Sequence, residues 1–370
     1  MKIAELDTPS LLFDRAIMQK NIDAMQAYAD RHGVALRPHT KTHKCPELAK
    51  LQLAAGARGV TVAKVGEAEV MARAGIMDIF IANEIVGECK LERIAALCAQ
   101  GCAVSFGIDG EEQALEIERV FARMGQTACV LAEIEVGENR SGFIEEADFL
   151  RLLYALRACP HVRLGGVFSH DGSSYDAPTR EAACEGSVRA QQRTLRFAQI
   201  ARENGFPCGT VSIGSTPSQA NGADIVPGVT EIRPGTYILM DASQAHAVGG
   251  DLSVCAATVL ATVISRPTAE RVVLDVGAKG LTMQTRNTGI CAVDGLGTLP
   301  DYPGVHIGCM FDEHAMVYEP AFREAVRVGQ KVRIIPVHIC PVCNLYDSAY
   351  LVDGGEVVGE VCIAGRGKLR

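Results

Sequence analysis

Between residues 34 and 240 the chain alternates short runs of β-branched and apolar residues with longer segments of helical periodicity. The eight short runs span residues 34–38, 59–63, 79–82, 103–108, 130–136, 164–169, 210–214 and 231–238. Strands separated by helices and short connections pair in parallel through right-handed crossovers. Eight such strands within roughly 200 residues are what a closed (β/α)8 barrel of TIM type requires.

The segments between these runs are amphipathic. Met18, Ile22, Met25 and Ala29 fall on one stripe with a period of about 3.6 residues, and residues 114–124 repeat the pattern. An open doubly wound sheet is the alternative arrangement of such a chain. No G-x-G-x-x-G motif follows the first strand, which disfavours a dinucleotide-binding version of that sheet. We therefore expect an α/β protein with a (β/α)8 barrel.

Beyond residue 240 the sequence has the pattern of strands and turns with little helix. The strand-like segments span residues 254–267, 271–278, 331–339 and 348–365. They predict a C-terminal, mainly antiparallel β-domain. The opening segment 8–14 also has a strand pattern, and we expect it to pair into this second domain. The predicted organisation is a barrel over residues 15–240 and a β-domain made of residues 1–14 together with 241–370.

Composition excludes several classes of function. The formal net charge is −8, which disfavours binding to nucleic acid or to an anionic membrane. No window approaches the roughly 18 consecutive apolar residues of a membrane span, and the N-terminal residues do not have the pattern of a signal peptide. The fourteen cysteines are scattered through apparent helices and strands, which favours free thiols in a reducing compartment. We expect a cytoplasmic protein with no nucleic-acid or membrane partner.

Polar clusters follow the predicted strands where the βα loops begin. They are RPHTKTHK (37–44), EVGENRSG (135–142), SHDGSSY (169–175), GSTPS (214–218) and RPGTY (233–237). Because the carboxyl ends of barrel strands meet on one face, these clusters predict a single site there. The small-residue loops after the seventh and eighth strands stand where barrels usually bind a phosphate group. Ordinary turn chemistry is the alternative for these two loops.

Lys41 is the candidate nucleophile of this site. It follows the first strand and is flanked by His39, His43 and Lys44. Neighbouring positive charge lowers the pKa of an amine and favours the neutral form that adds to an aldehyde. A solvated basic loop without a ligand is the alternative.

Near the C-terminus, the segment HICPVC offers a possible metal site. His338, Cys340 and Cys343 supply the imidazole and thiolate ligands that suit Zn²⁺ or a similar metal. The chain has no second C-x-x-C motif, so we do not expect a closed site with four cysteines. A buried histidine beside packed cysteines is the alternative, and the sequence assigns no role to Cys343.

Taken together, these motifs resemble the D-threonine aldolase and D-serine dehydratase family, relatives of alanine racemase with the fold type III pyridoxal-phosphate architecture. The resemblance runs over nearly the whole chain and rests on DTPSLLFD, RPHTKTHK, EVGENRSG, SHDGSSY, SIGSTPS, EIRPGTY, DEH, HICPVCN and the terminal AGRGK. It implies a pyridoxal 5'-phosphate cofactor and a small D-amino acid as substrate. It also implies a head-to-tail homodimer, in which the β-domain of one subunit faces the barrel mouth of the other.

The resemblance also implies roles for individual residues. Lys41 would carry the cofactor covalently and later exchange the proton at the substrate Cα. Arg140 would lie near the phenolic oxygen of the cofactor, Arg233 against its pyridine nitrogen, and Tyr175 would line the pocket. The remaining cofactor-binding residues would be Ser215, Thr216, Gly235 and Thr236 at the phosphate, together with Tyr237.

By the same resemblance, His338 and Cys340 would take part in catalysis by binding a divalent metal, Zn²⁺ or Mn²⁺. Such a metal polarises the β-hydroxyl of a D-3-hydroxy amino acid, which assists either dehydration or retro-aldol cleavage. The His-x-Cys pair and the SIGSTPS loop resemble the dehydratase branch, which acts on D-serine or D-3-hydroxyaspartate and gives a 2-oxo acid and ammonia. D-threonine aldolase-type cleavage to glycine and an aldehyde is the alternative, although that branch tends to have His-x-Asp and a glycine-rich phosphate loop. An amino-acid racemase and a non-enzymatic cofactor-binding protein are further alternatives.

Overall fold

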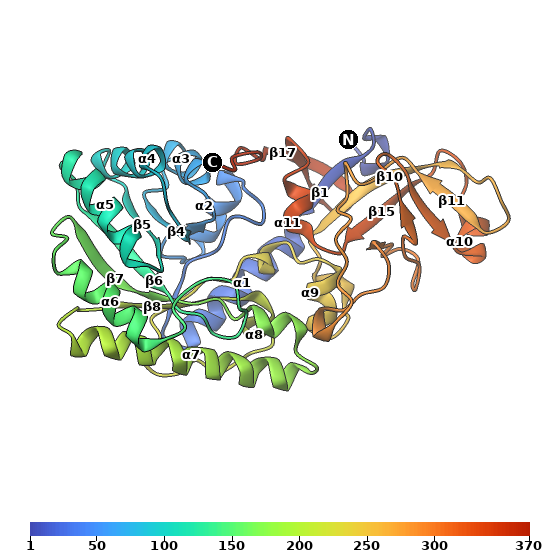
Figure 1. Cartoon of the computed structure of the whole chain (residues 1–370). Helices are drawn as coiled ribbons and strands as arrows, with labels where there is room; N and C mark the ends of the chain where they lie inside the picture. Colours follow the sequence, from blue (N-terminus) through green and yellow to red (C-terminus); the bar gives the residue numbers. More distant parts are fainter.

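The structure is a computed structural model that describes residues 1–370 as two parts, a barrel and a β-sheet body, which lie on the left and right of Figure 1. The barrel contains eight parallel strands in the order β2-β9-β8-β7-β6-β5-β4-β3. Their bounds are β2 (Ala35–Leu36), β3 (Val60–Val62), β4 (Asp78–Glu84), β5 (Ala103–Ile108), β6 (Ala128–Glu133), β7 (Val162–Phe168), β8 (Thr210–Ile213) and β9 (Glu231–Ile232). Each of the eight predicted runs contains or overlaps one of these strands.

The sheet closes between its first and last strands. An isolated parallel bridge joins His39, just beyond β2, to Thr61 in β3. The N–H of Thr40 donates to the carbonyl of Thr61 at 2.8 Å, and the N–H of Thr61 donates to the carbonyl of Pro38 at 2.8 Å. The closure therefore lies directly beside Lys41, and the predicted (β/α)8 barrel is confirmed.

Helices surround this barrel, as Figure 1 shows. They are α1 (Arg15–Arg31), α2 (Pro46–Ala54), α3 (Val65–Arg73), α4 (Glu88–Ala99), α5 (Glu111–Arg123), α6 (Glu146–Leu156), α7 (Arg180–Glu203) and the short α8 (Thr216–Ala220). The carboxylate of Asp14 accepts a hydrogen bond from the N–H of Ile17 at 3.0 Å and caps α1. The predicted stripe from Met18 to Ala29 is buried along α1.

The core of the barrel wall contains large aromatic side chains. Phe121 of α5 is fully buried and stacks on Phe106 of β5, with ring centroids 6.0 Å apart. Met124, the last residue of the predicted stripe, is exposed because α5 ends at Arg123. We expect Phe121→Ala to lower the free energy of unfolding by about 3–5 kcal/mol, because it leaves a cavity in the core. Urea unfolding would measure this loss, and a change below about 1 kcal/mol would contradict the packing.

The second part is built on a sheet with the order β13-β14-β11-β10-β1-β16-β17, and β15 pairs with both β10 and β12. Its strands are β1 (Ser10–Asp14), β10 (Ala257–Ser265), β11 (Arg271–Leu274), β12 (Gly297–Thr298), β13 (Cys309–Met310), β14 (Ala315–Tyr318), β15 (Lys331–Pro336), β16 (Ser348–Asp353) and β17 (Glu356–Cys362). β1 pairs antiparallel with β10 and parallel with β16, so the N-terminal strand belongs to this sheet. The exact division at residues 14 and 240 stays a prediction.

Several strands are shorter than predicted, and in two of them the chain turns into a short helix. The eighth barrel run, predicted over 231–238, ends at Ile232, because Pro234 has no N–H for the ladder and the chain turns into η3 (Thr236–Ile238). The segment predicted as a strand over 331–339 ends at Pro336, and His338 caps the short helix α11 (Ile339–Cys343). Other short helices of this part are α9 (Ala242–Ala247) and α10 (Pro320–Ala325).

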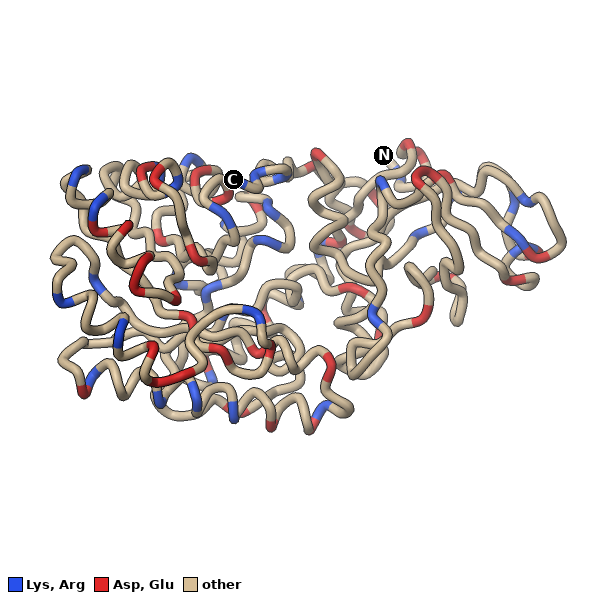
Figure 2. The backbone as a smooth tube through the Cα atoms, in the orientation of Figure 1, with Lys and Arg blue, Asp and Glu red and all other residues tan.

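Charged residues of both signs are interspersed along both parts of the chain, as Figure 2 shows. All fourteen cysteines are free thiols. None of the helices combines the length and the apolar content that crossing a membrane requires.

Candidate active site

Lys41, Arg140 and Arg233 line one cavity of about 320 Å³ at the carboxyl ends of the barrel strands. The structure thus brings together three residues that were predicted from different loops. His39 and His170 line the same cavity. In barrels of this type the reacting groups stand at this end of the strands.

Lys41 is largely enclosed at this position, and its Nζ takes part in none of the hydrogen bonds or ion pairs within the protein. Burial lowers its pKa, and the Arg140 guanidinium lowers the pKa further, although Cys340 and Glu138 oppose this shift. The same turn is fixed by Lys44, whose ammonium contacts Glu67 at 3.0 Å and Asn344 at 2.9 Å. Lys41 therefore lies on a fixed turn, and its amine loses its proton at a lower pH than an ordinary lysine, as a nucleophile requires.

Arg233 projects an unused hydrogen-bond donor into the site. Its Nη2 donates to the carbonyl of Ser169 at 2.7 Å, and its guanidinium lies between the rings of Phe80 and Phe168, at 5.6 and 5.3 Å from their centroids. Its Nη1 is buried without a partner. Burial lowers the pKa of Arg233 to about 10. A buried donor with no protein acceptor fits the ring nitrogen of pyridoxal phosphate.

Arg140 lies on the loop after β6, at the edge of the cavity. Its guanidinium contacts the carboxylates of Glu133 and Glu138, both at 3.4 Å. Ser141 donates to Glu133 at 2.8 Å and fixes the next residue of the loop. The contact with Glu133 aligns Arg140 with the barrel interior, where a phenolic oxygen would accept from it.

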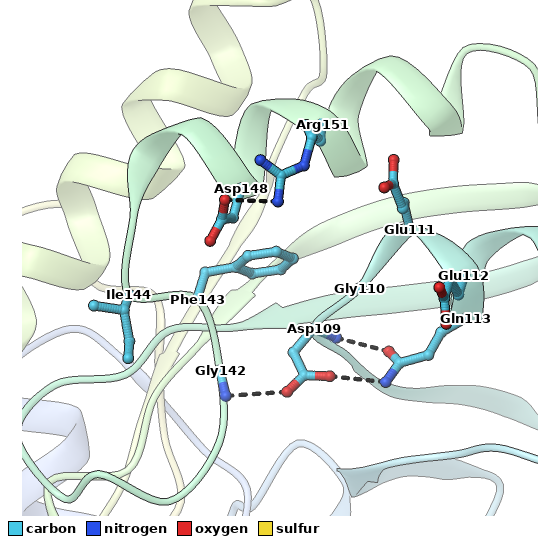
Figure 3. Close-up of a pocket in the computed structure, with 10 residues that line it drawn as sticks. All are labelled: Asp109, Gly110, Glu111, Glu112, Gln113, Gly142, Phe143, Ile144, Asp148 and Arg151. Atoms are coloured by element: carbon cyan, nitrogen blue, oxygen red, sulfur yellow. Dashed lines mark hydrogen bonds and ion pairs between the residues drawn. The ribbon is translucent and has the colours of Figure 1, made fainter.

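A hollow of about 380 Å³ outside the barrel mouth shows how this loop is anchored (Figure 3). The carboxylate of Asp109 accepts from the N–H of Gly142 at 3.2 Å and from the amide of Gln113 at 2.8 Å. Asp148 and Arg151, which lie one turn apart on α6, form an ion pair at 2.8 Å on one side of the hollow. The contacts of Asp109 attach the Arg140 loop to the start of α5, so we assign the hollow a structural role.

The two small-residue loops meet beside Lys41. The hydroxyl of Thr216 accepts from the N–H groups of Gly235 and Thr236, each at 3.2 Å. The Ser215 hydroxyl lies 3.0 Å from that of Ser174. A Cβ on Gly235 would lie 3.1 Å from the His39 carbonyl, so the cradle has no room for a larger residue. The clustered N–H and hydroxyl groups fit a phosphate.

Tyr237 and Tyr175 lie in different environments. Tyr237 is buried in the main core, where its hydroxyl accepts from the amide of Gln52 at 2.9 Å. It is not among the residues that line the cavity, so its predicted contact with the cofactor stays a prediction. Tyr175 lies on η2 (Gly172–Asp176), with its ring 6.2 Å from that of His170, and thus borders the mouth of the site.

His338 and Cys340 reach the same region from the β-domain. The Cys340 thiol lies 3.3 Å from the Thr42 hydroxyl and 3.7 Å from the Thr236 hydroxyl. His338 Nδ1 lies 2.8 Å from Oε1 of Gln284. Since this oxygen can only accept, Nδ1 carries the proton and Nε2 keeps a lone pair for a metal.

The protein offers this pair few further ligands. No group of three or more His, Cys, Asp or Glu side chains is placed to hold a metal. Cys343 is fully buried in the main core, where burial raises the pKa of its thiol. A metal on His338 and Cys340 would therefore keep coordination positions for the substrate, which fits a catalytic site better than a structural one.

Several site residues received no role from the sequence. His170 Nδ1 contacts Glu138 at 3.0 Å. Both residues belong to sequence motifs that were singled out because of other residues in the same motif. Glu84 at the end of β4 and Glu133 at the end of β6 also line the cavity. The position of Glu84 at the end of the strand 78–84 was the only signal for it, and the predicted strand stopped at residue 82.

Glu84 provides a test of these interior electrostatics. Burial raises the pKa of Glu84 to about 9, and the neighbouring Glu133 adds to the rise. The pKa of a glutamate in the unfolded chain is about 4.3, so this carboxyl takes up a proton on folding. The free energy of unfolding therefore falls as the pH rises from the unfolded-state pKa to the folded-state pKa. We expect Glu84→Gln to stabilise the protein at pH 8 by about 1–3 kcal/mol, with a smaller gain at pH 5. Urea unfolding at both pH values, with the exposed Glu112→Gln as control, would refute this if the gain were the same at both.

Comparison with known proteins places these features in a family. Residues 13–243 match the alanine racemase N-terminal domain, and residues 256–352 match the putative serine dehydratase domain. A D-threonine aldolase of Arthrobacter sp. is 38% identical over 99% of this chain and 94% of its own length. A D-threo-3-hydroxyaspartate dehydratase of Delftia sp. is 34% identical over 90% of this chain and 91% of its own length.

Solved structures of similar proteins share the whole fold. A D-threonine aldolase from Filomicrobium marinum has a TM-score of 0.90 at 32% identity and covers 100% of this chain and 98% of its own. The Delftia dehydratase has a TM-score of 0.91 at 29% identity over 98% of both chains. Variants of that dehydratase replace a histidine and a cysteine two positions further on, and its cysteine variant is in a metal-free form.

Proposed function

Since the chain belongs to the D-threonine aldolase and D-serine dehydratase family, whose members are pyridoxal-phosphate-dependent lyases, we propose that it dehydrates a D-3-hydroxy amino acid to a 2-oxo acid and ammonia. The observation that carries this proposal is the His338-x-Cys340 pair, which reaches the Lys41 loop through the contact of Cys340 with Thr42. Its spacing is that of the histidine and cysteine replaced in the Delftia dehydratase variants.

Different residues of the cavity would bind different parts of the cofactor. Lys41 would hold its aldehyde carbon covalently, Arg233 would donate Nη1 to its ring nitrogen, and Arg140 would contact its phenolic oxygen. The N–H and hydroxyl groups of Ser215, Thr216, Gly235 and Thr236 would hold its phosphate. When bound, the cofactor supplies an electron sink for charge that develops at Cα. The amine of Lys41 would then move the proton at that carbon.

A divalent metal, which we propose to be Zn²⁺ or Mn²⁺, would be held by Nε2 of His338 and the thiolate of Cys340. Imidazole and thiolate suit Zn²⁺ in particular. A metal at this place supplies Lewis acidity to the β-hydroxyl of the substrate. Thr42 and Thr236 would orient the Cys340 sulfur through their hydroxyl groups.

Retro-aldol cleavage to glycine and an aldehyde is the second candidate function. The observation that favours it is the 38% identity to the Arthrobacter D-threonine aldolase over 99% of the chain. The same residues would serve this reaction, because polarising the β-hydroxyl also prepares it to lose its proton.

Product analysis separates the two reactions. The purified holoenzyme would be incubated with D-serine, D-threonine and D-threo-3-hydroxyaspartate, with and without a chelator, and with the L-isomers as controls. We expect a 2-oxo acid and ammonia from at least one D-isomer, and loss of turnover with the chelator. Glycine and an aldehyde would establish the second candidate instead. Absence of turnover with every D-isomer would overturn both.

We also infer a head-to-tail homodimer and a cytoplasmic location. The dimer is supported by the resemblance and by Phe311, which is 63% exposed next to the turn between β13 and β14. The location is supported by fourteen free thiols, which persist in a reducing compartment. Light scattering that gives the mass of one chain would contradict the dimer.

A further inference from the structure

Arg286 is a basic side chain at the junction of the two parts that has no hydrogen-bond or ion-pair partner in the protein. It lies between β11 and η5 (Gly289–Cys291), and it takes part in none of the ion pairs of the structure. Its Nε is buried and has no hydrogen-bond partner. The rest of the side chain is half-buried.

Its neighbours place this guanidinium at the candidate active site. The Cζ atom lies 5.0 Å from the centroid of the Tyr175 ring. Two residues earlier, Gln284 accepts from Nδ1 of His338 at 2.8 Å. Arg286 therefore lies beside the tyrosine that borders the mouth, on the segment whose Gln284 contacts the proposed metal ligand His338.

The segment that carries Arg286 is fixed to the barrel. The Thr288 hydroxyl donates to the carboxylate of Asp176 at 2.6 Å, and the N–H of Ile290 donates to the carbonyl of Ala177 at 2.8 Å. A Cβ on Gly289 would lie 2.3 Å from the Asp176 carbonyl carbon, so the two backbones are in direct contact. Arg286 is thus held in position before any ligand arrives.

The nearby carboxylates are engaged elsewhere. Glu138 contacts His170 and Arg140, and Asp241 accepts from the N–H groups of Gln244 and Ile339. A partly desolvated guanidinium without an acceptor is unfavourable, and the ring of Tyr175 offsets only part of that cost. A carboxylate matches the planar guanidinium in bidentate geometry and supplies the missing charge.

We propose that Arg286 binds the α-carboxylate of the substrate. This inference rests on the proposed function and extends it, because it says which residue recognises the α-carboxylate that all 2-amino acids share. With its amino group at Lys41 and its β-hydroxyl at His338 and Cys340, a substrate bound at Arg286 is held at three points. The site then selects anionic 2-amino acids over the corresponding amides and amino alcohols.

The test compares two ligands that differ only at this group. D-Alanine and D-alaninamide lack the β-hydroxyl and are not substrates of the proposed lyase, so their affinity for the holoenzyme can be measured by calorimetry. We expect Arg286→Gln to weaken D-alanine about 30- to 100-fold, because a charge-assisted bidentate contact is lost, and to change D-alaninamide less than about threefold. Arg286→Lys should recover part of the loss, because its ammonium keeps the charge without the bidentate geometry.

The control is Arg266→Gln. Arg266 stands in the turn between β10 and β11 and also has a buried Nε without a partner, but its guanidinium does not contact Tyr175. It should leave both affinities unchanged. Thermal unfolding would establish that each variant is folded.

Two outcomes would overturn the proposal. They are equal weakening of both ligands by Arg286→Gln, and no weakening of either. Failure of the lyase reaction is a separate result. If no D-3-hydroxy amino acid is turned over while Arg286→Gln still weakens only D-alanine, the proposed function fails and this inference stands.

Discussion

Lys41→Ala should lower the lyase turnover number by about 10³-fold or more, because it removes the amine that we propose to hold the cofactor and to move the proton. No neighbouring amine can take over this role. Lys44 is held by Glu67 at 3.0 Å and by Asn344 at 2.9 Å, and it does not line the cavity. The measurement is the initial rate with the best D-3-hydroxy amino acid at saturating cofactor.

The matched control is Lys50→Ala. Lys50 is exposed on α2 and belongs to the same stretch of the chain. It should leave the rate within about twofold of the wild type, since surface substitutions have small effects. A Lys41→Ala variant that kept the rate of the control would contradict the assignment of Lys41.

Cys340→Ala and His338→Ala should each lower turnover by about 10²-fold or more, because either variant loses a ligand of the metal that we propose to activate the leaving hydroxyl. Both should keep the cofactor bound, since Lys41, Arg233 and the phosphate loops are unchanged. Chelation of the wild-type enzyme should reproduce the loss, and added Zn²⁺ or Mn²⁺ should restore only the wild type. Initial rates and cofactor absorbance measure the two effects separately.

Cys362→Ser is the control for the cysteine variant. Cys362 is an exposed free thiol at the end of β17 and should be silent. Full activity of Cys340→Ala together with insensitivity to chelators would contradict a metal-dependent lyase. That result would favour the racemase alternative, which has no use for this pair.

The barrel could be predicted because its signal is local. Each strand is a short apolar run that ends in polar residues, and each helix has a buried stripe, so the period of the sequence changes at every boundary. The prediction failed where one residue overrode the pattern. Pro234 ends the eighth strand early, and helix α5 stops one residue before Met124.

The site could be predicted only in part. The loops with Lys41, Arg140 and Arg233 follow strand ends, and the topology of a barrel brings strand ends together. Arg286 belongs to a different part of the chain and reaches the site because its segment packs on η2. No local sequence pattern predicts this packing. The buried Glu84 likewise depends on which residues oppose it across the barrel.

The proposed function depends most on Lys41 as the point where the cofactor is attached. Reduction of the holoenzyme with borohydride, followed by proteolysis and mass spectrometry, would locate the cofactor directly. We predict a single modified peptide that carries the phosphopyridoxyl group on Lys41. Modification of another lysine, or no modification of a protein that has bound the cofactor, would contradict the account.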